Sequence, residues 1–437
     1  MITAKAFAGN SYAVLGLARS GAATVEALLA SGANVTAWDR QDVARAPFEG
    51  RCELADPLEI DLSGFAGVVV SPGVPLNTHP IKPHAEKFGV PVIGDIELFA
   101  LARPELPAHR VAGITGTNGK STTTALVHHI LKTADVPTTM GGNIGLPILA
   151  QEPLPEGGVY VLELSSYQID LTYSLDCDVA VLLNITPDHL DRYDGHFDKY
   201  AASKLRLLKM QSGEHLSIVG DIMPEGLVIA FDTDSIPKID PSRQLIWPSL
   251  AGPHNAENAS AAIQTCIELD LAPGDIERGL CSFTGLPHRM ELVTKHGGVL
   301  YINDSKATNP DSTAPALAAY PPENGKPRIH WIVGGLPKED GLGPCEQHLG
   351  NIAAAYTIGD AGPRFAELLE PHVPVERAEM LQDAVSRAMA SAREGDVVLL
   401  SPACASFDQF RDYEARGEHF RQVVVALTGE LRASDEA

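Results

Sequence analysis

The sequence predicts an α/β protein built from parallel sheets, and two observations support this prediction. Short runs rich in β-branched residues recur along the 437-residue chain, and amphipathic stretches of helical period separate them. Strands and helices that alternate in this way form parallel sheets with crossover helices. The predicted strands include Tyr12–Leu15, Val68–Val70, Val159–Leu164, Val179–Ile185, Arg328–Val333 and Asp396–Leu400.

The chain is too long for one ordinary hydrophobic core, so we expect two or three domains. The segment Ala102–Arg110 contains two prolines just before a strand and a glycine-rich turn, which is typical of a linker. A second joint, Thr284–Arg289, follows the helical region Asn255–Asp270 and precedes another series of strands. We therefore place three domains at 1–98, 99–286 and 287–437.

The composition and net charge of the chain exclude some classes of binding partner. Asp and Glu outnumber Lys and Arg by 56 to 33, which gives a formal net charge of -23. Such a field repels nucleic acid and anionic membranes, so we expect neither as a partner. The six cysteines form no Cys-x-x-Cys pair, which suits a reducing compartment. No stretch has signal-peptide character or the roughly 18 apolar residues of a membrane span. We expect a cytoplasmic monomer.

The first segment resembles a nucleotide-binding βαβ unit. A strand ends at Gly16, a turn runs to Gly21, a helix extends to about Ala30, and a second strand ends at Asp39. Such a turn offers backbone N–H groups to a phosphate, and Asp39 lies where a ribose-contacting acid would sit. Ala18 replaces the middle glycine of the dinucleotide pattern. A tight turn that needs glycines for geometry alone is an equal interpretation.

The strongest local signal is GITGTNGKST at Gly113–Thr122, directly after a strand. Glycines let the backbone wrap phosphate oxygens, Lys120 adds a positive charge, and Ser121 or Thr122 offers a hydroxyl to Mg²⁺. Ile114 occupies a position where the complete phosphate-loop pattern has glycine. The motif still predicts a site for the phosphates of ATP.

Two later strands end in residues that suit a metal and phosphate site. Glu163 ends the strand Val159–Leu164, and His189 follows the strand Val179–Ile185. Singly, Glu163 could be a surface carboxylate, and His189 could be a helix cap or a core histidine. Because two parallel strands deliver ligand-type residues to the same edge, we favour a metal-binding role for both.

These motifs resemble the Mur ligases, and the resemblance follows almost the whole chain in the same order. The phosphate-loop, His and His-Arg motifs are shared by sister ligases and by folylpolyglutamate synthetase. DSKATN and SPACASFDQF are more particular and look like the members that add D-glutamate. The motifs are GLARSG at 16–21, SPG at 71–73, TGTNGKST at 115–122, GGNIG at 141–145, ELSSYQ at 163–168, TPDHLDRY at 186–193, HNAEN at 254–258, LPHRME at 286–291, NDSKATNPDST at 303–313 and SPACASFDQF at 401–410.

The resemblance implies a fold and a reaction. The expected domains are a Rossmann-like domain that binds the UDP substrate, a P-loop ATPase-like domain and a Rossmann-like domain for the amino acid. The expected substrates are ATP, UDP-N-acetylmuramoyl-L-alanine and D-glutamate, with Mg²⁺ as cofactor. The terminal phosphoryl group of ATP would pass to the substrate carboxylate, and the amine of D-glutamate would attack the acyl phosphate. This is a cytoplasmic step of peptidoglycan synthesis.

The resemblance also implies roles for residues of this sequence. Lys120, Glu163, His189 and Lys204 are the expected catalytic residues, and Lys204 matches the position that carries a carbamate, although an ordinary exposed lysine is the alternative. The residues expected to bind ATP are Gly116, Thr117, Asn118, Gly119, Lys120, Ser121, Thr122, Asn258, Arg289 and Asp304. The residues expected to bind the UDP substrate are Arg19, Ser20, Asp39, Arg40, Ser71, Gly73, Asn143 and His189. The amino acid is expected to bind Lys306, Thr308, Lys338 and Ser406, and the metal is expected to bind Ser121, Glu163, His189 and carbamylated Lys204.

Two departures from the family pattern lie near the expected amino-acid site. Tyr413 stands where phenylalanine is familiar, and Leu336-Pro337 replaces more polar residues before Lys338. Neither removes a charged contact. The alternatives are a sister Mur ligase, a folylpolyglutamate synthetase-like ligase and, in a different class, an ATP-sensing binding protein.

Overall fold

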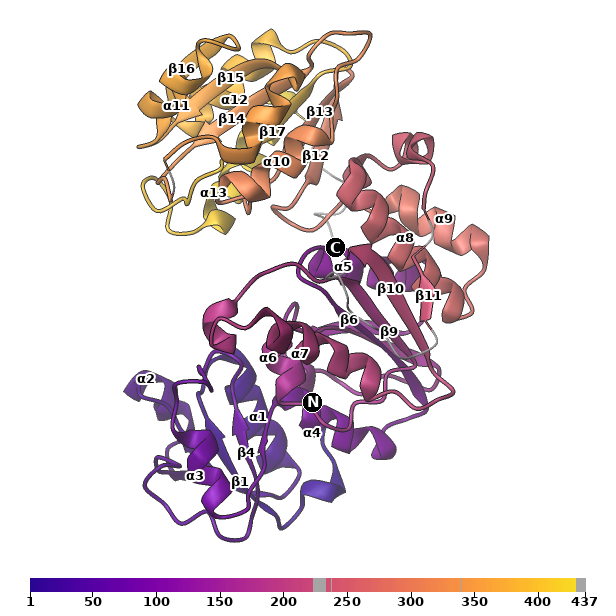
Figure 1. The fold of residues 1–437 in the computed structure, drawn as a ribbon, viewed down its shortest axis with the longest axis vertical. Coiled ribbons are helices and arrows are strands. Elements are labelled where there is room, and N and C mark those ends of the chain that lie inside the picture. Colours follow the sequence, from indigo (N-terminus) through magenta and orange to yellow (C-terminus); the bar gives the residue numbers. More distant parts are fainter. Residues whose placement is uncertain (223–232, 237, 339, 430–437) are drawn as a thin grey trace. The chain divides into compact units, whose positions relative to one another are not determined.

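A computed structural model describes residues 1–222, 233–236, 238–338 and 340–429. Three sheets follow one another along the chain, each with helices against it (Figure 1). The predicted α/β class is therefore confirmed. The predicted strands all occur, and their ends differ from the observed ones by at most three residues; the run predicted at Val68–Val70, for example, is the strand β4 at Phe65–Val70.

The first sheet has the strand order β3-β2-β1-β4-β5, and every pair is parallel. This is the order expected of a Rossmann-like sheet, in which β1 and β4 meet where the order reverses. Its strands are β1 Ser11–Leu15, β2 Asn34–Trp38, β3 Glu53–Leu54, β4 Phe65–Val70 and β5 Val92–Ile93, and its helices are η1 Lys5–Phe7, α1 Arg19–Ala30, α2 Asp42–Arg45, η2 Ala46–Phe48, α3 Ile81–Lys87, α4 Asp95–Ala102 and η3 Arg103–Glu105.

The second sheet is also fully parallel and has the order β11-β10-β9-β6-β8-β7. Its strands are β6 His109–Thr115, β7 Thr138–Gly142, β8 Gly158–Glu163, β9 Val179–Asn184, β10 Leu216–Ile222 and β11 Thr233–Ser235. The helices of this region and of the segment that follows it are α5 Lys120–Thr133, η4 Ile148–Ala150, α6 Ser166–Asp170, η5 Leu190–Tyr193, α7 Phe197–Lys209, η6 Pro241–Ile246, η7 Pro248–Leu250, α8 Pro253–Glu268 and α9 Pro273–Ser282.

The third sheet has the order β12-β13-β17-β14-β15-β16. Its first two strands pair antiparallel, which the prediction of parallel sheets did not include, and the other pairs are parallel. Gly297 and Gly298, with φ of 57° and 78°, form the tight turn of this hairpin. The elements are β12 Glu291–His296, β13 Val299–Asn303, α10 Pro310–Ala318, β14 Ile329–Gly334, η8 Gly343–Asn351, β15 Ile352–Ile358, α11 Gly362–Leu369, β16 Val375–Glu379, α12 Leu381–Ser391, β17 Val397–Leu400 and α13 Tyr413–Thr428.

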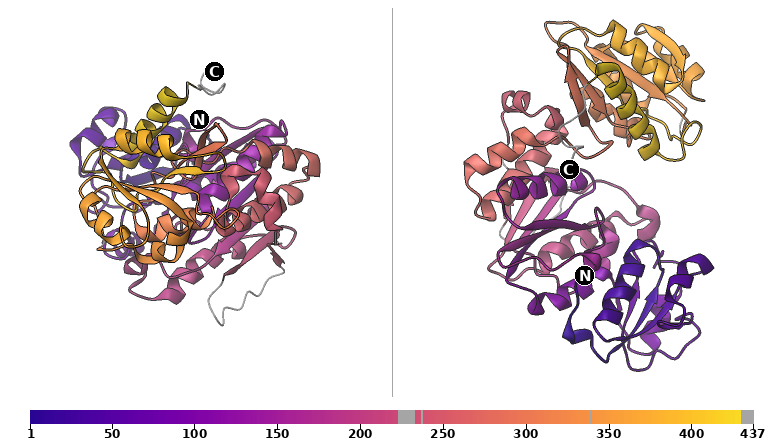
Figure 2. Two further views of the ribbon diagram at one scale, coloured as in Figure 1. Left: turned by 90° about the horizontal axis from the view of Figure 1, so that it is seen from above. Right: turned by 180° about the vertical axis from the view of Figure 1, so that it is seen from behind.

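The central strands are buried along their whole length, as parallel strands covered by helices must be. All six residues of β8, of β9 and of β14 are buried. In the third sheet, α10 and α11 contribute to one hydrophobic cluster and α12 and α13 to another, on opposite faces (Figure 2). Successive side chains of β14 alternate between the two faces, so Trp331 belongs to the first cluster and Ile332 to the second.

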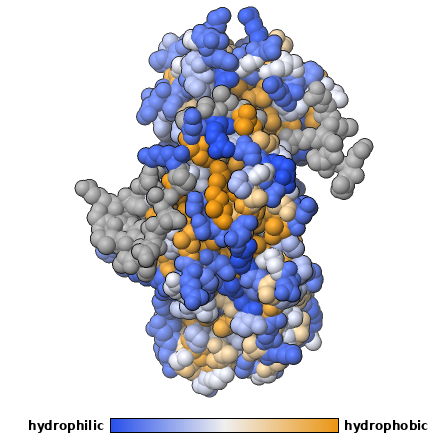
Figure 3. Space-filling view, turned by 90° about the vertical axis from the view of Figure 1, so that its right-hand side faces the viewer, coloured by the Kyte–Doolittle hydropathy of each residue, from blue (hydrophilic) through white to orange (hydrophobic). Residues whose placement is uncertain are grey.

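The chain forms two compact units. The first consists of Met1–Pro237 and Asn258–Gly279, and the second of Lys238–Glu257 and Leu280–Ala437. The first unit thus holds two of the three sheets. The division into three domains, with boundaries at 98 and 286, remains a prediction. Hydrophilic and apolar residues are interspersed on the face drawn in Figure 3. None of the helices in the described ranges is both long and apolar enough to span a bilayer.

Candidate active site

The topology of the second sheet brings three predicted segments to one edge. Strand β6, which leads into the phosphate loop, lies between β9 and β8. Glu163 ends β8, and the segment with His189 follows β9. Since the three strands are parallel, their carboxyl ends point to the same edge of the sheet. The prediction that two parallel strands bring Glu163 and His189 to the same edge of one sheet is confirmed.

The phosphate loop needs its glycines. Gly116 has a φ of 157° and Gly119, which caps α5, has a φ of 84°. A Cβ atom at Gly119 would lie 2.1 Å from Oδ1 of Asn258, so a side chain there would collide with α8. Thr123 in α5 donates a 3.3 Å hydrogen bond to the same Asn258 oxygen. Asn258, expected to contact ATP, therefore lies against the loop and helix that carry the phosphate motif.

Asn184, the last residue of β9, fixes the middle of the loop. Its Oδ1 accepts hydrogen bonds from the backbone N–H of Thr117 at 3.1 Å and of Asn118 at 2.8 Å, and its Nδ2 donates to the Asn118 carbonyl at 3.2 Å. Asn184 was not predicted from the sequence. A polar residue that ends the apolar run VAVLLN is the signal that could have identified it.

The two lysines of the predicted site share one backbone acceptor. Lys120 donates from Nζ to the carbonyls of Gly116 at 2.9 Å and Thr117 at 2.8 Å. Lys204, from α7, donates to the same Gly116 oxygen at 2.7 Å. Both ammonium groups therefore lie at the start of the phosphate loop, where an anion would be attracted.

Lys204 is a buried lysine, with a relative exposure of 1%. Its position follows from the amphipathic pattern of α7, in which Tyr200, Leu207 and Leu208 are also buried. Its Nζ lies 4.7 Å from the centre of the Tyr200 ring. Burial, followed by repulsion from Lys120, lowers the pKa of Lys204 to about 7. The alternative of an ordinary exposed lysine is wrong.

Glu163 is buried and has one oxygen without a protein partner. Its Oε1 accepts a 2.8 Å hydrogen bond from Nδ2 of Asn143, whereas its Oε2 is buried and has no hydrogen-bond partner. An orphaned buried carboxylate oxygen costs free energy unless a cation or water satisfies it. In the described part of the chain, no three side chains of His, Cys, Asp and Glu lie close enough to hold a metal ion together. The predicted metal set differs from such a group because it includes Ser121 and Lys204.

His189 lies at the start of η5 in a left-handed conformation, with φ of 51°. Its ring is about half exposed, lies 5.4 Å from the ring of Tyr167, and has Nε2 3.5 Å from a carboxylate oxygen of Asp188. The core alternative for this histidine is therefore wrong. The helix-cap alternative is also unsupported, because the His189 side chain makes no capping hydrogen bond.

In the first sheet, the expected UDP-binding residues gather around the turn after β1. A Cβ at Gly21 would lie 1.8 Å from the Gly16 carbonyl oxygen, so geometry alone requires a glycine there. Asp39 accepts a 2.8 Å hydrogen bond from the backbone N–H of Leu17, and Ser71 donates to the Gly16 carbonyl at 2.8 Å. Both side chains therefore brace the turn. The role of the turn in binding a nucleotide stays a prediction.

Other residues of this group reach toward the second sheet. Arg19, at the start of α1 beside Ser20, donates a 2.9 Å hydrogen bond to the Gly145 carbonyl in the GGNIG motif. Arg192, from η5, donates to the carbonyl of Gly73 at 3.3 Å. Arg40 follows Asp39 just after the end of β2. The GLARSG, SPG, GGNIG and TPDHLDRY motifs are thus brought together in the first unit.

The expected amino-acid residues gather in the second unit. Strands β13, β17 and β14 are parallel neighbours in the sheet. Lys306 and Thr308 follow β13, Ser406 follows β17, and Lys338 follows β14. Lys338 Nζ donates a 3.0 Å hydrogen bond to the Thr308 hydroxyl. Ser406 is buried, and Lys306 Nζ lies 5.5 Å from the centre of the Tyr413 ring. A lysine and two hydroxyl side chains at one sheet edge suit a carboxylate ligand.

Arg416 joins two of these segments and was missed from the sequence. It is buried in α13, and it donates to the hydroxyl and the carbonyl of Ser305 at 3.0 and 2.8 Å. It also donates to the carbonyls of Cys404 and Ala405 at 3.0 and 3.2 Å. These acceptors are uncharged, and burial lowers the pKa of Arg416 to about 10. An arginine within an amphipathic helix is normally expected on the exposed face, so the sequence carried no clear signal that Arg416 is buried.

Asp304 and Arg289, expected to contact ATP, also belong to the second unit. Asp304 is buried; its Oδ1 accepts from the Met290 N–H at 3.1 Å and its Oδ2 from the Ser401 hydroxyl at 2.8 Å. Burial raises the pKa of Asp304 to about 7, and the hydrogen bonds and Arg289 oppose this rise. Arg289 precedes β12 and takes part in a short bridge with Leu286.

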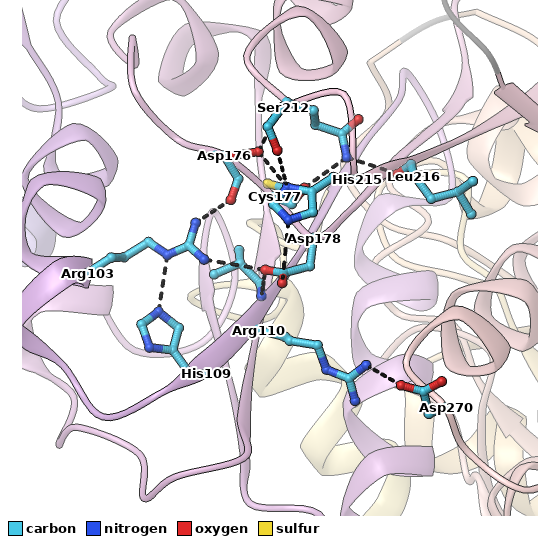
Figure 4. Close-up of polar contacts among 12 residues, drawn as sticks. Arg103, His109, Arg110, Asp176, Cys177, Asp178, Ser212, His215, Leu216 and Asp270 are labelled. Carbon is cyan, nitrogen blue, oxygen red and sulfur yellow. Dashed lines mark hydrogen bonds and ion pairs between the residues drawn. The ribbon is translucent and has the colours of Figure 1, made fainter.

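Figure 4 shows a second polar cluster of the second sheet. Asp176 and Asp178 precede β9, and His215 precedes β10. His215 Nδ1 is 2.7 Å from Asp176, while Asp178 accepts from Arg103 at 3.3 Å and from the Val111 N–H at 2.8 Å. These contacts tie together the amino ends of strands, whereas the phosphate loop follows a carboxyl end. The cluster is therefore separate from the candidate site.

Comparison with protein families gives two matches. Residues 114–226 match the Mur ligase middle domain, and residues 288–404 match the family described as Mur ligase, glutamate ligase domain. The first match contains the phosphate loop, Glu163, His189 and Lys204, and the second contains the third sheet.

Curated relatives match over nearly their whole length. A UDP-N-acetylmuramoylalanine–D-glutamate ligase of Novosphingobium aromaticivorans is 63% identical, with 99% of this chain and 98% of the relative covered. A relative of the same name from Sphingopyxis alaskensis is 59% identical, with 98% and 100% covered. Another from Zymomonas mobilis is 52% identical, again with 98% and 100% covered.

Solved structures share the fold at low sequence identity. The UDP-N-acetylmuramate–alanine ligase of Thermotoga maritima superposes with a TM-score of 0.53 at 17% identity, covering 96% of this chain and 99% of that chain. A UDP-N-acetylmuramoyl-L-alanyl-D-glutamate–2,6-diaminopimelate ligase gives 0.56 at 15% identity, covering 86% and 95%. At such identities the likeness concerns the fold alone.

Proposed function

Because the chain belongs to the Mur ligase family, we propose that it joins D-glutamate to UDP-N-acetylmuramoyl-L-alanine in an ATP-dependent step of cytoplasmic peptidoglycan synthesis. Full-length identity of up to 63% to ligases of that name supports the substrates. The observation that carries the chemistry is the meeting of the phosphate loop with buried Glu163 and Lys204 at one sheet edge.

The reaction makes an amide by way of an acyl phosphate. An oxygen of the substrate carboxylate attacks the γ-phosphorus of ATP, and the bond to the bridging oxygen breaks as ADP leaves. The amine of D-glutamate then attacks the activated carbonyl carbon. The tetrahedral species loses phosphate, and the nitrogen loses a proton. A carboxylate does not condense with an amine unaided in water, so the protein must align the reactants and balance their negative charge.

The phosphate loop is suited to the ATP side of this reaction. Lys120 already lies at the loop with its ammonium group on two loop carbonyls, from which it can turn to the β- and γ-phosphates. Backbone N–H groups of the loop and the start of α5 offer donors to phosphate oxygens. We assign Asn258, Arg289 and Asp304 to ATP as well, each by its match to the family motif.

Residues of the first unit suit a magnesium ion. The orphaned Oε2 of buried Glu163 is an anionic oxygen that needs a partner, and oxygen ligands are those that Mg²⁺ prefers. Ser121 and His189 would complete the set together with Lys204. When bound, the ion would neutralise charge on the phosphates and the developing acyl phosphate. Asn143 holds Glu163 in place through its hydrogen bond to Oε1.

We propose that Lys204 is carbamylated in the active enzyme. Carbon dioxide adds only to a neutral amine, and burial lowers the pKa of Lys204 to about 7, so a large neutral fraction exists at neutral pH. The carbamate would replace a cation that repels Lys120 with an anion that attracts both Lys120 and a metal ion.

The other two substrates have separate binding residues in this proposal. Lys338, Thr308 and Ser406, with Lys306 beside them, would hold the two carboxylates of D-glutamate. The uridine nucleotide would bind in the first unit. The residues assigned to it are Arg19, Ser20, Asp39, Arg40, Ser71, Gly73, Asn143 and His189.

A substrate-dependence assay tests the proposal. We expect phosphate release from ATP to require UDP-N-acetylmuramoyl-L-alanine and D-glutamate together, and a product larger by one glutamate residue to appear by mass spectrometry. Faster release with L-alanine or meso-diaminopimelate would identify a sister ligase. ATP binding without release under any pair of substrates would favour an ATP-sensing protein.

A further inference from the structure

We propose that Asp170 is a positioning residue of the active site: by accepting the hydroxyl hydrogen of Tyr193, it fixes the segments that carry His189 and Lys204. The proposal rests on the function proposed above, because it concerns the residues expected to hold the metal. Asp170 itself is assigned no contact with a substrate.

The proposal begins with two hydrogen bonds and one close hydroxyl–hydroxyl contact that together connect three helices. Asp170 is the last residue of α6, and its Oδ2 accepts a 2.9 Å hydrogen bond from the Tyr193 hydroxyl. The same hydroxyl lies 3.3 Å from Oγ of Ser203 in α7. Ser203 in turn donates a 2.9 Å hydrogen bond to the carbonyl of Ser166, the first residue of α6. Both ends of α6 are therefore tied to η5 and α7.

This set of contacts includes the neighbours of two expected ligands. Tyr193 ends η5, and His189 directly precedes this short helix, so both belong to one tight turn. Ser203 directly precedes Lys204 on α7. Tyr193 and Ser203 are buried residues, so a lost partner would not be replaced by bulk water without rearrangement. A change at Asp170 should thus move the His189 turn relative to α7.

Aromatic packing extends the same assembly to the phosphate loop. The ring of Tyr167 lies 5.4 Å from His189 and stacks 6.3 Å from Tyr193. Tyr193 meets Tyr200 edge to face at 5.5 Å. The Tyr200 hydroxyl is 3.1 Å from Oγ1 of Thr117 in the loop. The rings supply packing, whereas the Asp170 carboxylate supplies the directed contact that sets the position of Tyr193.

The positioning role predicts a particular kinetic signature. Tyr193→Phe keeps the ring but removes the hydroxyl, and Asp170→Ala removes the acceptor. We expect each to lower kcat about 10-fold and to raise the Mg²⁺ concentration for half-maximal rate several-fold, since loss of a residue that orients a metal ligand commonly costs about 10- to 100-fold in affinity or activity. The KM for D-glutamate should stay unchanged. Asp170→Asn, which keeps an acceptor oxygen, should retain most of the wild-type kcat.

Hydrogen exchange of the ligand-free full chain provides a readout independent of activity. In Tyr193→Phe and Asp170→Ala, amides of 186–196 and 197–209 should exchange faster than in wild type, and those of the third sheet should not change. Tyr160→Phe is the matched control: the Tyr160 hydroxyl accepts a 2.9 Å hydrogen bond from the Leu154 N–H in the same unit, away from the site. This variant should leave the rate, Mg²⁺ dependence and exchange of 186–209 unchanged.

The outcomes separate this proposal from the proposed function. If wild type shows no D-glutamate-dependent phosphate release, the function is wrong, and faster exchange of 186–209 in the variants would still support the structural link. If wild type is active and both variants keep its kcat, Mg²⁺ dependence and exchange pattern, the positioning role is overturned. A fall in kcat in Asp170→Asn equal to that in Asp170→Ala would also overturn it, because the acceptor oxygen would then be irrelevant.

Discussion

Lys204 Nζ lies 2.7 Å from the carbonyl oxygen of Gly116, the residue that opens the phosphate loop. Lys120 donates to the same oxygen, so two ammonium groups converge on one acceptor. Two cations this close repel each other, and burial of Lys204 makes its charged form still less favourable. Burial and this repulsion lower the pKa of Lys204 to about 7, which favours the neutral amine. The arrangement therefore favours reaction of Lys204 with carbon dioxide.

The first prediction concerns replacements of Lys204. Lys204→Ala should lower turnover by at least about 100-fold, because a metal-ligating anion is lost. Acetate or another short carboxylate should restore part of the rate, since it can fill the vacated space and supply oxygens. Lys204→Arg should not recover, because it returns a cation. Initial rates with and without acetate provide the measurement, and full activity of the alanine variant would refute the assignment.

The second prediction concerns Lys120. Lys120→Ala should lower turnover by about 1,000-fold, through loss of charge stabilisation in the transition state. The free energy of unfolding should change by only about 1 kcal/mol, because the lost hydrogen bonds are partly exposed ones. Lys132→Ala, at the other end of α5, is the control and should keep wild-type kinetics. Activity of Lys120→Ala above roughly a tenth of wild type would contradict the role.

The fold was predictable because burial leaves a simple pattern in the sequence. The strands β8 and β9 are apolar runs, and both were recognised with ends displaced by a single residue. The antiparallel hairpin of β12 and β13 at the edge of the third sheet was not predicted. The Gly297-Gly298 pair is a local turn signal, but the other predicted strands indicated parallel sheets throughout.

The site was predictable where a motif is contiguous and unpredictable where contacts join distant segments. The phosphate loop lies within ten consecutive residues, 113–122. Asn184 reaches that loop across 66 residues of sequence, and Tyr193 reaches Asp170 across 23. Such partners depend on how helices pack after the strands have been placed, which no local pattern encodes. The burial of Lys204 was predictable only in part. The amphipathic pattern of α7 places Lys204 on the buried face of the helix, but its partner Gly116 is distant in the sequence.

The third prediction concerns recognition of the amino acid. Lys338→Ala should raise the KM for D-glutamate about 10- to 100-fold, because a hydrogen bond to a charged group contributes about 1.5–3 kcal/mol. The KM for ATP should change little. Lys326→Ala, an exposed lysine in a turn of the same unit, is the control. Steady-state kinetics with each substrate varied in turn provide the test, and an unchanged KM for D-glutamate would remove Lys338 from the binding site.

The last prediction concerns stability and pH at Asp304. Burial raises the pKa of this carboxyl from its usual range to about 7, so between about pH 4 and 7 the folded chain binds a proton that the unfolded chain has released. The contribution of Asp304 to the free energy of unfolding therefore falls as pH rises through this window. Asp304→Asn keeps an acceptor for the Met290 N–H and cannot ionise, so it should lose this dependence.

Denaturant midpoints of the full chain at pH 5, 6, 7 and 8 can test this difference. Wild type should lose stability relative to Asp304→Asn as pH rises to 7, by up to about 1.4 kcal/mol for each unit by which the pKa is raised. Above pH 7 the difference should level off, because Asp304 is then ionised in both states. Asp311→Asn removes an exposed carboxylate in the first turn of α10 and serves as the control, which should follow wild type. Parallel pH profiles for wild type and Asp304→Asn would show that Asp304 is ionised throughout this range, with Ser401 and the Met290 N–H stabilising its charge more than burial opposes it.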